Sequence, residues 1–305
     1  MRTPPGGRPE DESPPPTEAV PLDDGDPHSP TVVRPASPGA REANVSVPAE
    51  AAQAGASARF GKFIRTEKIG AGGMGEVWKA WDTGLSRWVA LKFMKEQEAA
   101  EIERFRREAR LAGKLNHPFI ASIYEVGCDQ DRHFIAMQYV DGQTLLDFPR
   151  ADRRLLVRLV RDAGLAVDHA HAQGIIHRDL KPHNLMVTTR VVGRSERTSE
   201  HHVYVMDFGL ARAQRGPDMS VSGGIVGTPA YMSPEQASGA RAGPAADVYA
   251  LGATLYELLT GLPPVVAKTA LETLRLVKEG EVRPPRLLDP SVDADLDTIV
   301  MKCLE

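Results

Sequence analysis

Residues 177–184 of the chain read HRDLKPHN, and this stretch carries the clearest chemical signal in the sequence. Asp179 can accept a proton from a substrate hydroxyl, and Lys181 can neutralise charge on a phosphoryl group during transfer. Asn184 can ligate a metal ion through its amide oxygen. A polar loop after a helix would explain each residue singly, but so many identities at fixed spacing seldom coincide. The stretch therefore predicts a site for phosphoryl transfer.

A second motif, Asp207-Phe208-Gly209, follows downstream and directly after the apolar residues 203–206, which are typical of a strand. Such a tripeptide has little meaning alone. Because it follows HRDLKPHN, we interpret Asp207 as a second hard oxygen ligand, of the kind that suits Mg²⁺.

Upstream, residues 70–77 read GAGGMGEV. Glycines allow a backbone to approach a phosphate closely, with its N–H groups as donors. A dinucleotide-binding turn uses the same spacing, but that turn opens a helix. Here the β-branched and aromatic run VWKAW follows at 77–81, which indicates a strand. A flexible turn remains the simplest alternative for this motif taken alone.

Residues 89–92, VALK, place a lysine at the end of an apolar strand. After a glycine-rich loop, Lys92 can reach the phosphates of a nucleotide and then needs a carboxylate to hold it. Glu108 lies on the predicted helix 98–115 and could supply that carboxylate. Taken singly, Lys92 is better explained as a solvated strand end and Glu108 as a solvated charge on a helix.

Composition narrows the class of protein. The 305 residues include 37 Lys and Arg against 41 Asp and Glu, for a net charge of −4, which argues against nucleic acid or membrane surfaces as bulk electrostatic partners. Cys128 and Cys303 lie far apart and are expected to be free thiols. No apolar run is long enough to span a bilayer and the N-terminus lacks an apolar signal core, so we expect a cytoplasmic protein.

The pattern along the chain predicts a disordered tail over residues 1–57, which are rich in Pro and acidic residues and poor in aromatics. Strands are expected over 63–69, 76–81, 88–94, about 119–127 and 132–139. Helices are expected over 98–115, 153–171, 245–259, 270–278 and 295–305. A strand-rich part followed by a helix-rich part favours an α+β architecture with two lobes.

Taken together, these motifs resemble the eukaryotic-type (Hanks-type) serine/threonine protein kinases, including their bacterial members, over about residues 63–305. The downstream strings GTPAYMSPE at 227–235 and DVYALG at 247–252 keep the family's motif order. The resemblance implies a bilobal kinase fold, with an N-lobe over about 58–140 and a C-lobe over about 141–305. It also implies a signalling enzyme that uses ATP and Mg²⁺ to phosphorylate proteins, with no nucleic acid among its partners.

The resemblance carries the family's catalytic roles onto matching positions. Asp179 is implied as the catalytic base, and Lys181 as the residue that stabilises the γ-phosphate. Asn184 and Asp207 are implied as the Mg²⁺ ligands.

The same resemblance implies an ATP site. Lys92 is expected to contact the α- and β-phosphates and to pair with Glu108. Met137 matches the gatekeeper, and residues 138–140 match the hinge that bonds adenine. Val77, Ala90 and Met186 match the walls of the adenine pocket, and Gly70, Gly72 and Gly75 match the glycines that cover the phosphates. The remaining ATP-binding positions that it implies are Ile69, Gln138 and Val140.

Two positions point to Ser and Thr hydroxyls as acceptors. Lys181 lies two residues beyond the base, which is the arrangement of the Ser/Thr class. Thr228 matches a residue that contacts the base and this lysine in that class, so we count it among the catalytic residues.

Regulation is expected in the polar segment 213–225, which contains Ser220 and Ser222. A phosphate there could pair with Arg178 and order the segment. We therefore expect autophosphorylation during transient self-association of two copies.

The chain also departs from the family pattern. Residues 188–202 are longer and more polar than the usual hairpin, which predicts a surface insertion. The sequence ends within the family's penultimate helix, before the arginine that pairs with the position of Glu235. We expect an incomplete C-lobe that is only marginally stable, aggregation-prone or poorly active, unless Arg283 or Arg286 compensates for Glu235. A pseudokinase that only binds nucleotide is the alternative, although every expected catalytic residue is present.

Overall fold

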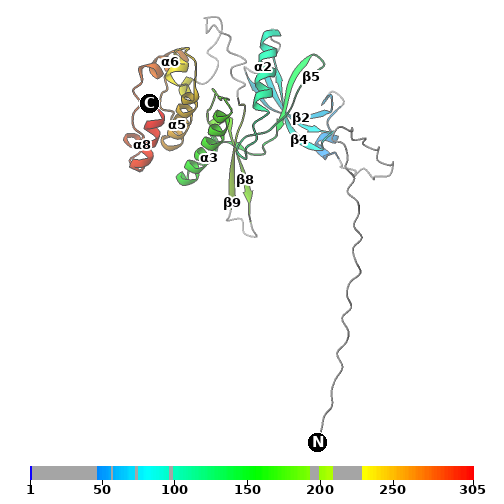
Figure 1. The fold of residues 1–305 in the computed structure, drawn as a ribbon, viewed down its shortest axis with the longest axis horizontal. Coiled ribbons are helices and arrows are strands. Elements are labelled where there is room, and N and C mark those ends of the chain that lie inside the picture. The colour runs from blue at the N-terminus through cyan, green and yellow to red at the C-terminus, as the bar shows by residue number, and fades with distance from the viewer. Residues whose placement is uncertain (2–46, 56–57, 73–74, 96–98, 193–198, 209–228) are drawn as a thin grey trace, which may run out of the picture. The chain divides into compact units, whose positions relative to one another are not determined.

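The computed structural model describes Met1 and residues 47–55, 58–72, 75–95, 99–192, 199–208 and 229–305. Residues Val45–Glu305 belong to one compact unit, and everything below concerns its described part. The element labels are those of Figure 1.

The first half of this unit is built on a six-stranded antiparallel sheet with the strand order β1-β2-β3-β4-β6-β5. Each central strand contains aromatic and β-branched residues, such as Trp78, Val89 and Phe134, as expected for a pleated surface with packing on its faces. The strands are β1 (Arg59–Phe60), β2 (Phe63–Gly72), β3 (Gly75–Asp82), β4 (Arg87–Met94), β5 (Ile123–Asp129) and β6 (Arg132–Gln138).

The two faces of the sheet have separate cores. On one face, Phe60 and Phe93 meet edge to face with ring centroids 4.8 Å apart, inside a cluster that includes Leu91. On the opposite face, α2 (Ala99–Ala112) packs Phe105 and Ala109 against the strands. Figure 1 shows α2 beside β5 and the rest of the sheet. This second face is the one that bears the predicted nucleotide-binding residues.

A short helix, α1 (Ala49–Ala52), precedes the sheet. Ala51 is buried against Ile64 and Trp81, and Glu50 forms an ion pair with Lys79. The expectation of disorder through residue 57 is therefore wrong for residues 47–55. One small apolar side chain is enough to fix the position of this helix, because the sheet supplies the aromatic partners. Composition alone does not show such a contact.

The second half is mainly helical, with a three-stranded antiparallel sheet of β7 (Gln143–Thr144), β8 (Leu185–Val191) and β9 (Ser199–Val205). Helix α3 (Arg153–Ala172) packs on β9 and on α5 (Pro244–Thr260), and α5 also contacts α8 (Ala294–Cys303) (Figure 1). The shorter helices are α4 (Pro234–Ala237), α6 (Ala270–Glu279) and α7 (Pro285–Leu288), with 3-10 turns at Pro182–Asn184 and Pro229–Tyr231. One hydrophobic core joins these elements, with Leu159, Leu185 and Tyr256 among its most buried members.

The predicted α+β class, with a strand-rich part followed by a helix-rich part, is confirmed, and the long strands and helices fall within a few residues of their expected bounds. In the stretch 188–202, which was expected to be a surface insertion, residues 189–192 and 199–200 are exposed. The stretch continues β8 and β9 in register as far as the pair Val191–Ser199, so most of it is paired strand, while 193–198 lie outside the described residues. Within the described ranges, no helix is both long and apolar enough to cross a membrane. The division into lobes at about residue 140 stays a prediction.

Candidate active site

A buried carboxylate fixes the backbone of the HRDLKPHN loop. Asp247, in the first turn of α5, is fully buried and accepts hydrogen bonds from the backbone N–H groups of His177 and Arg178, both at 2.8 Å. His171 Nε2 lies 2.8 Å from the same carboxylate. Arg178 has a φ of 68°, a left-handed conformation that costs a non-glycine residue energy and persists only when its surroundings hold it. Asp247 stabilises this conformation because its carboxylate accepts hydrogen bonds from the two backbone amides.

His177 connects the two motifs that bear the candidate carboxylates. Its ring is fully buried, and its Nδ1 accepts a hydrogen bond from the backbone N–H of Asp179 at 3.3 Å. Nε2 then carries the proton and donates to the carbonyl of Met206, 2.7 Å away. The ring also packs on Phe208, with centroids 4.8 Å apart. One imidazole thus ties the residue before Asp207 to the backbone of Asp179.

The three loop residues singled out from the sequence lie together. Lys181 Nζ is 2.8 Å from Asp179 Oδ2. Asn184 Nδ2 donates to the Asp179 backbone carbonyl at 2.6 Å and to Asp179 Oδ2 at 3.2 Å. The 3-10 turn at Pro182–Asn184, with Pro182 preset for its first position, brings Asn184 back toward the loop. The side chain of Asp179 therefore lies between a cation and an amide.

Asp207 lies directly after β9 and also has a left-handed backbone, with a φ of 60°. Its Oδ2 forms an ion pair with Lys92 Nζ at 2.8 Å. Burial alone would raise the pKa of Asp207, but Lys92, together with the more distant His177 and Lys181, outweighs it and holds the pKa below the ordinary value. Asp207 is therefore ionised at neutral pH, as a metal ligand requires.

Lys92 and Glu108 come from elements that pack together. Lys92 is on β4 and 5% exposed, and Glu108 is on α2 and 8% exposed. The helix face that includes Glu108 also carries Phe105 and Ala109, which pack against Ala90 of β4. Lys92 pairs with Asp207 in the structure, and its pairing with Glu108 stays a prediction.

Two of the predicted walls of the adenine pocket, Val77 and Ala90, share one face of the sheet with the predicted gatekeeper Met137. Val77 is directly opposite Lys92 across β3 and β4, and Ala90 is opposite Met137 across β4 and β6. Val77, Ala90 and Met137 belong to one apolar cluster. Met186 comes from β8 in the second sheet and is partly buried. Val77, Ala90 and Met137 therefore lie together on the face that also bears Lys92. The role of Met186 stays a prediction.

The predicted hinge begins where β6 ends. Gln138 is the last residue of β6, and its backbone N–H donates to the carbonyl of Ser122 at 2.8 Å. Val140 is buried just beyond it. Ile69, on β2, is 43% exposed, so its apolar side chain is available to a ligand. Contact of these residues with adenine stays a prediction.

The glycine-rich stretch joins two antiparallel strands. Gly70 and Gly72 end β2, Gly75 begins β3, and residues 73–74 lie outside the described residues. Gly75 has a φ of 126°, and a Cβ there would lie 2.0 Å from the carbonyl oxygen of Phe93. A Cβ on Gly70 would meet only Val77, at an ordinary 3.6 Å. Close strand packing therefore demands glycine at 75, whereas at 70 the fold alone does not.

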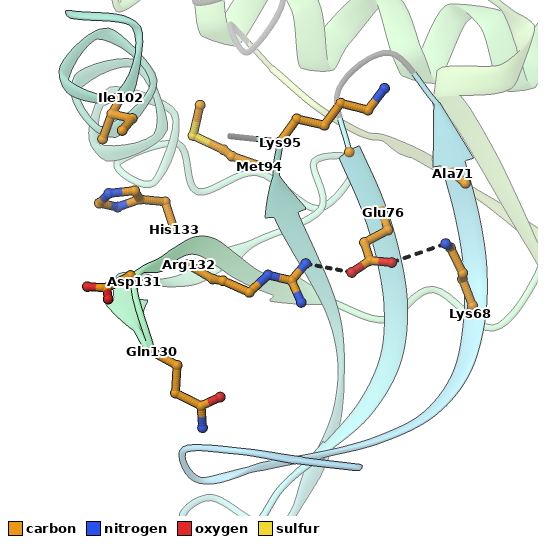
Figure 2. A pocket seen from close by; sticks show the side chains of 11 residues that line it. Lys68, Ala71, Glu76, Met94, Lys95, Ile102, Gln130, Asp131, Arg132 and His133 are labelled. Carbon is orange, nitrogen blue, oxygen red and sulfur yellow. Dashed lines mark hydrogen bonds and ion pairs between the residues drawn. The ribbon is translucent and has the colours of Figure 1, made fainter. Parts of the chain in front are cut away.

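A charged bridge lies next to this glycine-rich stretch, and sequence reasoning missed it. Glu76 Oε1 is 2.5 Å from Arg132 Nη2, and Glu76 Oε2 is 3.1 Å from Lys68 Nζ. The hydrogen bond from Arg132, with help from Lys68, outweighs burial and lowers the pKa of Glu76 to about 2. Figure 2 shows the three side chains meeting over β2, β3 and β4 at the wall of a cavity of about 710 Å³. The bridge ties β2, β3 and β6 together beside the predicted phosphate-binding turn.

The residues available for a divalent cation fit Mg²⁺. Asn184 turns its Nδ2 toward Asp179, which leaves its Oδ1, a hard carbonyl oxygen, as the free end of the amide. Asp207 supplies an ionised carboxylate. Within the described residues, no cluster of three or more His, Cys, Asp and Glu side chains could hold a metal by itself. Mg²⁺ is commonly bound by one or two protein oxygens plus substrate phosphates, and the donor pair matches that pattern.

The segment after residue 228 is anchored to the same loop. Gln236 Nε2 donates to the carbonyl of Arg178 at 2.9 Å, and Ser233 caps α4 in a capping box with Gln236. Tyr231 donates its hydroxyl to Glu257 at 2.5 Å, and burial followed by this carboxylate raises the pKa of Tyr231. These contacts hold Tyr231 and Gln236 close to Asp179. Residues of both segments line a small hollow there.

Glu235 lies in the first turn of α4 and is partly buried. Among the described residues it forms no ion pair. The suggested compensation by Arg283 or Arg286 is therefore wrong for this structure. The backbone of Arg283 accepts a hydrogen bond from Tyr256 instead.

Several predicted positions lie outside the described residues. They include Thr228 and the segment 213–225, with Ser220 and Ser222. Their roles stay predictions. Asp247 is the main functional residue whose role the sequence did not reveal. Its string, DVYALG, follows the family's motif order, but its contacts with residues 70 positions upstream have no local signature.

Comparison with known proteins places these features in one family. Residues 63–305 match the protein kinase domain family. Curated relatives include a probable serine/threonine-protein kinase, SCO3848, of Streptomyces coelicolor (37% identical, covering 80% of this chain and 37% of the relative). Others are the serine/threonine-protein kinases PknB of Mycolicibacterium smegmatis (38% identical, covering 78% and 39%) and PrkC of Bacillus subtilis (35% identical, covering 79% and 37%). The chain thus spans less than two fifths of the length of these relatives.

Among solved structures, the kinase domain of Mycobacterium tuberculosis PknI superposes with a TM-score of 0.60 at 26% identity. The match covers 81% of this chain and 89% of that one. A double mutant of the same domain gives a TM-score of 0.61.

Proposed function

This chain belongs to the protein kinase domain family, and we propose that it transfers the γ-phosphate of ATP to serine and threonine hydroxyls of proteins. One observation carries the proposal. Asp179 contacts both Lys181 and Asn184. The carboxylate of Asp247 accepts a hydrogen bond from the backbone of the same loop, and His177 bonds the residue before Asp207. This arrangement supports the proposal that Asp179 is the base, that Lys181 is the cation beside it, and that Asn184 and Asp207 are the oxygen ligands.

In the proposed reaction, the acceptor hydroxyl oxygen forms a bond to the γ-phosphorus of ATP while the bond from that phosphorus to the bridging oxygen breaks. ADP leaves with the bridging oxygen. The hydroxyl proton passes to a carboxylate oxygen of Asp179. Lys181, 2.8 Å from that carboxylate, places a positive charge next to the acceptor. Such fixed charges act mainly by positioning and electrostatic stabilisation.

Asn184 and Asp207 would hold Mg²⁺. When bound there, Mg²⁺ would neutralise negative charge on the phosphates of ATP during transfer. Lys92 contributes a further positive charge from β4 and keeps Asp207 ionised. The glycine-rich stretch offers backbone N–H groups to the phosphates. Val77, Ala90 and Met137 offer an apolar face to the adenine ring, with Gln138 and Val140 as hinge positions.

The preference for Ser and Thr rests on the relatives and on the place of Lys181 two residues beyond Asp179. PknB and PrkC are both called serine/threonine-protein kinases, and SCO3848 is called a probable one. Autophosphorylation at Ser220 or Ser222, through transient self-association, belongs to the same proposal. Dependence on ATP favours a cytoplasmic setting for the domain.

The glycine motif could also have indicated a dinucleotide-binding turn, as in a nicotinamide-dependent dehydrogenase, but this alternative loses its support. The motif joins the antiparallel strands β2 and β3, whereas a dinucleotide-binding turn leads from a parallel strand into a helix.

The test is incubation with γ-labelled ATP, Mg²⁺ and a library of Ser-, Thr- and Tyr-containing peptides, followed by phosphoamino acid analysis. Label on phosphoserine and phosphothreonine is expected. Label only on phosphotyrosine contradicts the substrate class. ATP binding without any transfer indicates a pseudokinase and contradicts the proposed activity.

A further inference from the structure

We propose that residues 47–55, which precede the sheet, are a working part of the nucleotide-binding face, with Glu50 as a positioning residue for ATP. This inference rests on the proposed function and extends the functional unit beyond the region that matches the family, which begins at residue 63.

The first observation is that α1 is docked rather than merely helical. Ala51 is 2% exposed and packs in one cluster with Ile64 and Trp81. Trp81 meets Trp88 edge to face at 5.3 Å across β3 and β4, which gives the small alanine a wide aromatic platform. Ala54 packs on the same cluster. The burial of one alanine by two strands explains why so short a helix has a defined position.

The second observation is the side of the sheet on which α1 docks. Side chains alternate along a strand, so Val77, Lys79 and Trp81 of β3 share one face. Val77 contacts the apolar cluster that includes Ala90, a predicted adenine wall. Ala90 is also directly opposite Lys79 in register. The short helix therefore covers the outer end of the same face whose inner end is predicted to bind adenine.

The third observation is a charged link between α1 and that inner end. Glu50 Oε2 is 3.0 Å from Lys79 Nζ, whose side chain is only 17% exposed. The Glu50 carboxylate, by its hydrogen bond, raises the pKa of Lys79. The same ammonium group lies over the Trp88 ring at 4.4 Å and over the Tyr139 ring at 5.4 Å.

Tyr139 gives this link its functional meaning. It lies between Gln138 and Val140, at the centre of the predicted hinge. Glu50 orients the ammonium group of Lys79. Lys79 is paired with Ala90 across the strands, and its ammonium group lies over the ring of Tyr139. Without Glu50, Lys79 loses its fixed partner and the hinge ring loses a fixed cation. The expected consequence is weaker adenine binding, with the transfer step unchanged.

The test uses matched substitutions in the full chain. Ala51→Asp places a charge in the aromatic cluster and undocks α1, whereas Ala52→Asp, at the neighbouring exposed position, does not. Glu50→Ala removes the ion pair with Lys79. Glu279→Ala is its control, because it removes an ion pair of a glutamate with similar exposure (51% against 46%) on α6. Affinity for ATP is measured by calorimetry with Mg²⁺, and steady-state kinetics give KM and kcat.

We expect Ala51→Asp and Glu50→Ala to raise the Kd and KM for ATP by about two- to fivefold, the range of a partly exposed ion pair, with kcat unchanged. Both controls should match the parent. The double variant Glu50→Lys with Lys79→Glu should recover part of the loss. A lower melting temperature with an unchanged Kd for ATP overturns the proposal, since α1 would then only stabilise the fold. A parent protein that binds ATP but transfers no phosphate contradicts the proposed function instead, and leaves the Kd comparison intact.

Discussion

Lys92 Nζ lies 2.8 Å from Asp207 Oδ2, and this contact joins β4 of the large sheet to the residue that follows β9. Both residues were expected from the sequence to face ATP, one through its phosphates and one through Mg²⁺. Their direct contact means that the proposed phosphate-binding lysine and the proposed metal ligand lie side by side. The pair also keeps Asp207 ionised and available to a metal.

Asp207→Asn removes the charged metal ligand while preserving the shape of the side chain. We expect the Kd for ATP measured with Mg²⁺ to rise by at least about tenfold, because the metal links protein to phosphates. The Kd measured in the presence of a chelator should change little. Calorimetric titration under both conditions checks this. An equal effect with and without Mg²⁺ would show that Asp207 acts on ATP without a metal.

Asp247→Ala leaves the amides of His177 and Arg178 without their buried acceptor. Each unpaired buried donor costs about 1–3 kcal/mol, so we expect the free energy of unfolding to fall by about 2–5 kcal/mol. The Arg178 backbone, with its φ of 68°, also loses its support, so kcat should fall. Asp168→Ala, at an exposed position on α3, is the control for urea unfolding and kinetics. A variant with parental stability and kcat would show that Asp247 is not needed to hold the backbone of His177 and Arg178.

Glu76→Gln tests the charged bridge through pH. The pKa of Glu76 is lowered from 4.5 to about 2, so its contribution is present above pH 4.5 and is lost as the pH falls toward 2. We expect the variant to be less stable than the parent by about 1–3 kcal/mol at pH 7. The gap should close as the pH falls from 4.5 toward 2 in urea unfolding. Glu279→Gln, in an exposed ion pair, should stay within about 0.5 kcal/mol of the parent. A gap independent of pH would show that charge is not the cause.

Gly70→Ala and Gly75→Ala separate folding from nucleotide binding. At Gly75 a Cβ would lie 2.0 Å from the Phe93 carbonyl oxygen, so the melting temperature should fall. At Gly70 a Cβ makes only an ordinary contact, so the melting temperature should stay parental. If the stretch approaches the phosphates closely, Gly70→Ala should still weaken ATP binding. Thermal unfolding and ATP titration of both variants provide the measurement, and parental ATP affinity of Gly70→Ala would contradict the phosphate-binding role.

The sequence was most informative where chemistry depends on short spacing. Asp179, Lys181 and Asn184 lie within six residues, so their proximity in space follows from one loop. The long helices and the central strands also followed from periodicity, because each buries one regular face. Two cysteines predicted to be free thiols are free in the structure.

The contacts that the sequence did not predict are mainly those between segments far apart along the chain. Asp247 bonds His177 across 70 positions, and Arg132 bonds Glu76 across 56 positions. Such pairs depend on tertiary packing and leave no periodic signal. The docking of residues 47–55 was missed for a related reason. Ala51 has little apolar surface of its own, and the aromatic surface that buries it lies on β3 and β4.

The central claim is that Asp179 takes the proton in a phosphoryl transfer, and Asp179→Asn tests it most directly. Asparagine keeps an oxygen for Asn184 and a similar shape, so ATP affinity by calorimetry should be parental. Single-turnover transfer of labelled phosphate to a peptide should fall by about 10²–10⁴-fold. Transfer at the parental rate, with ATP bound equally well, would contradict the account.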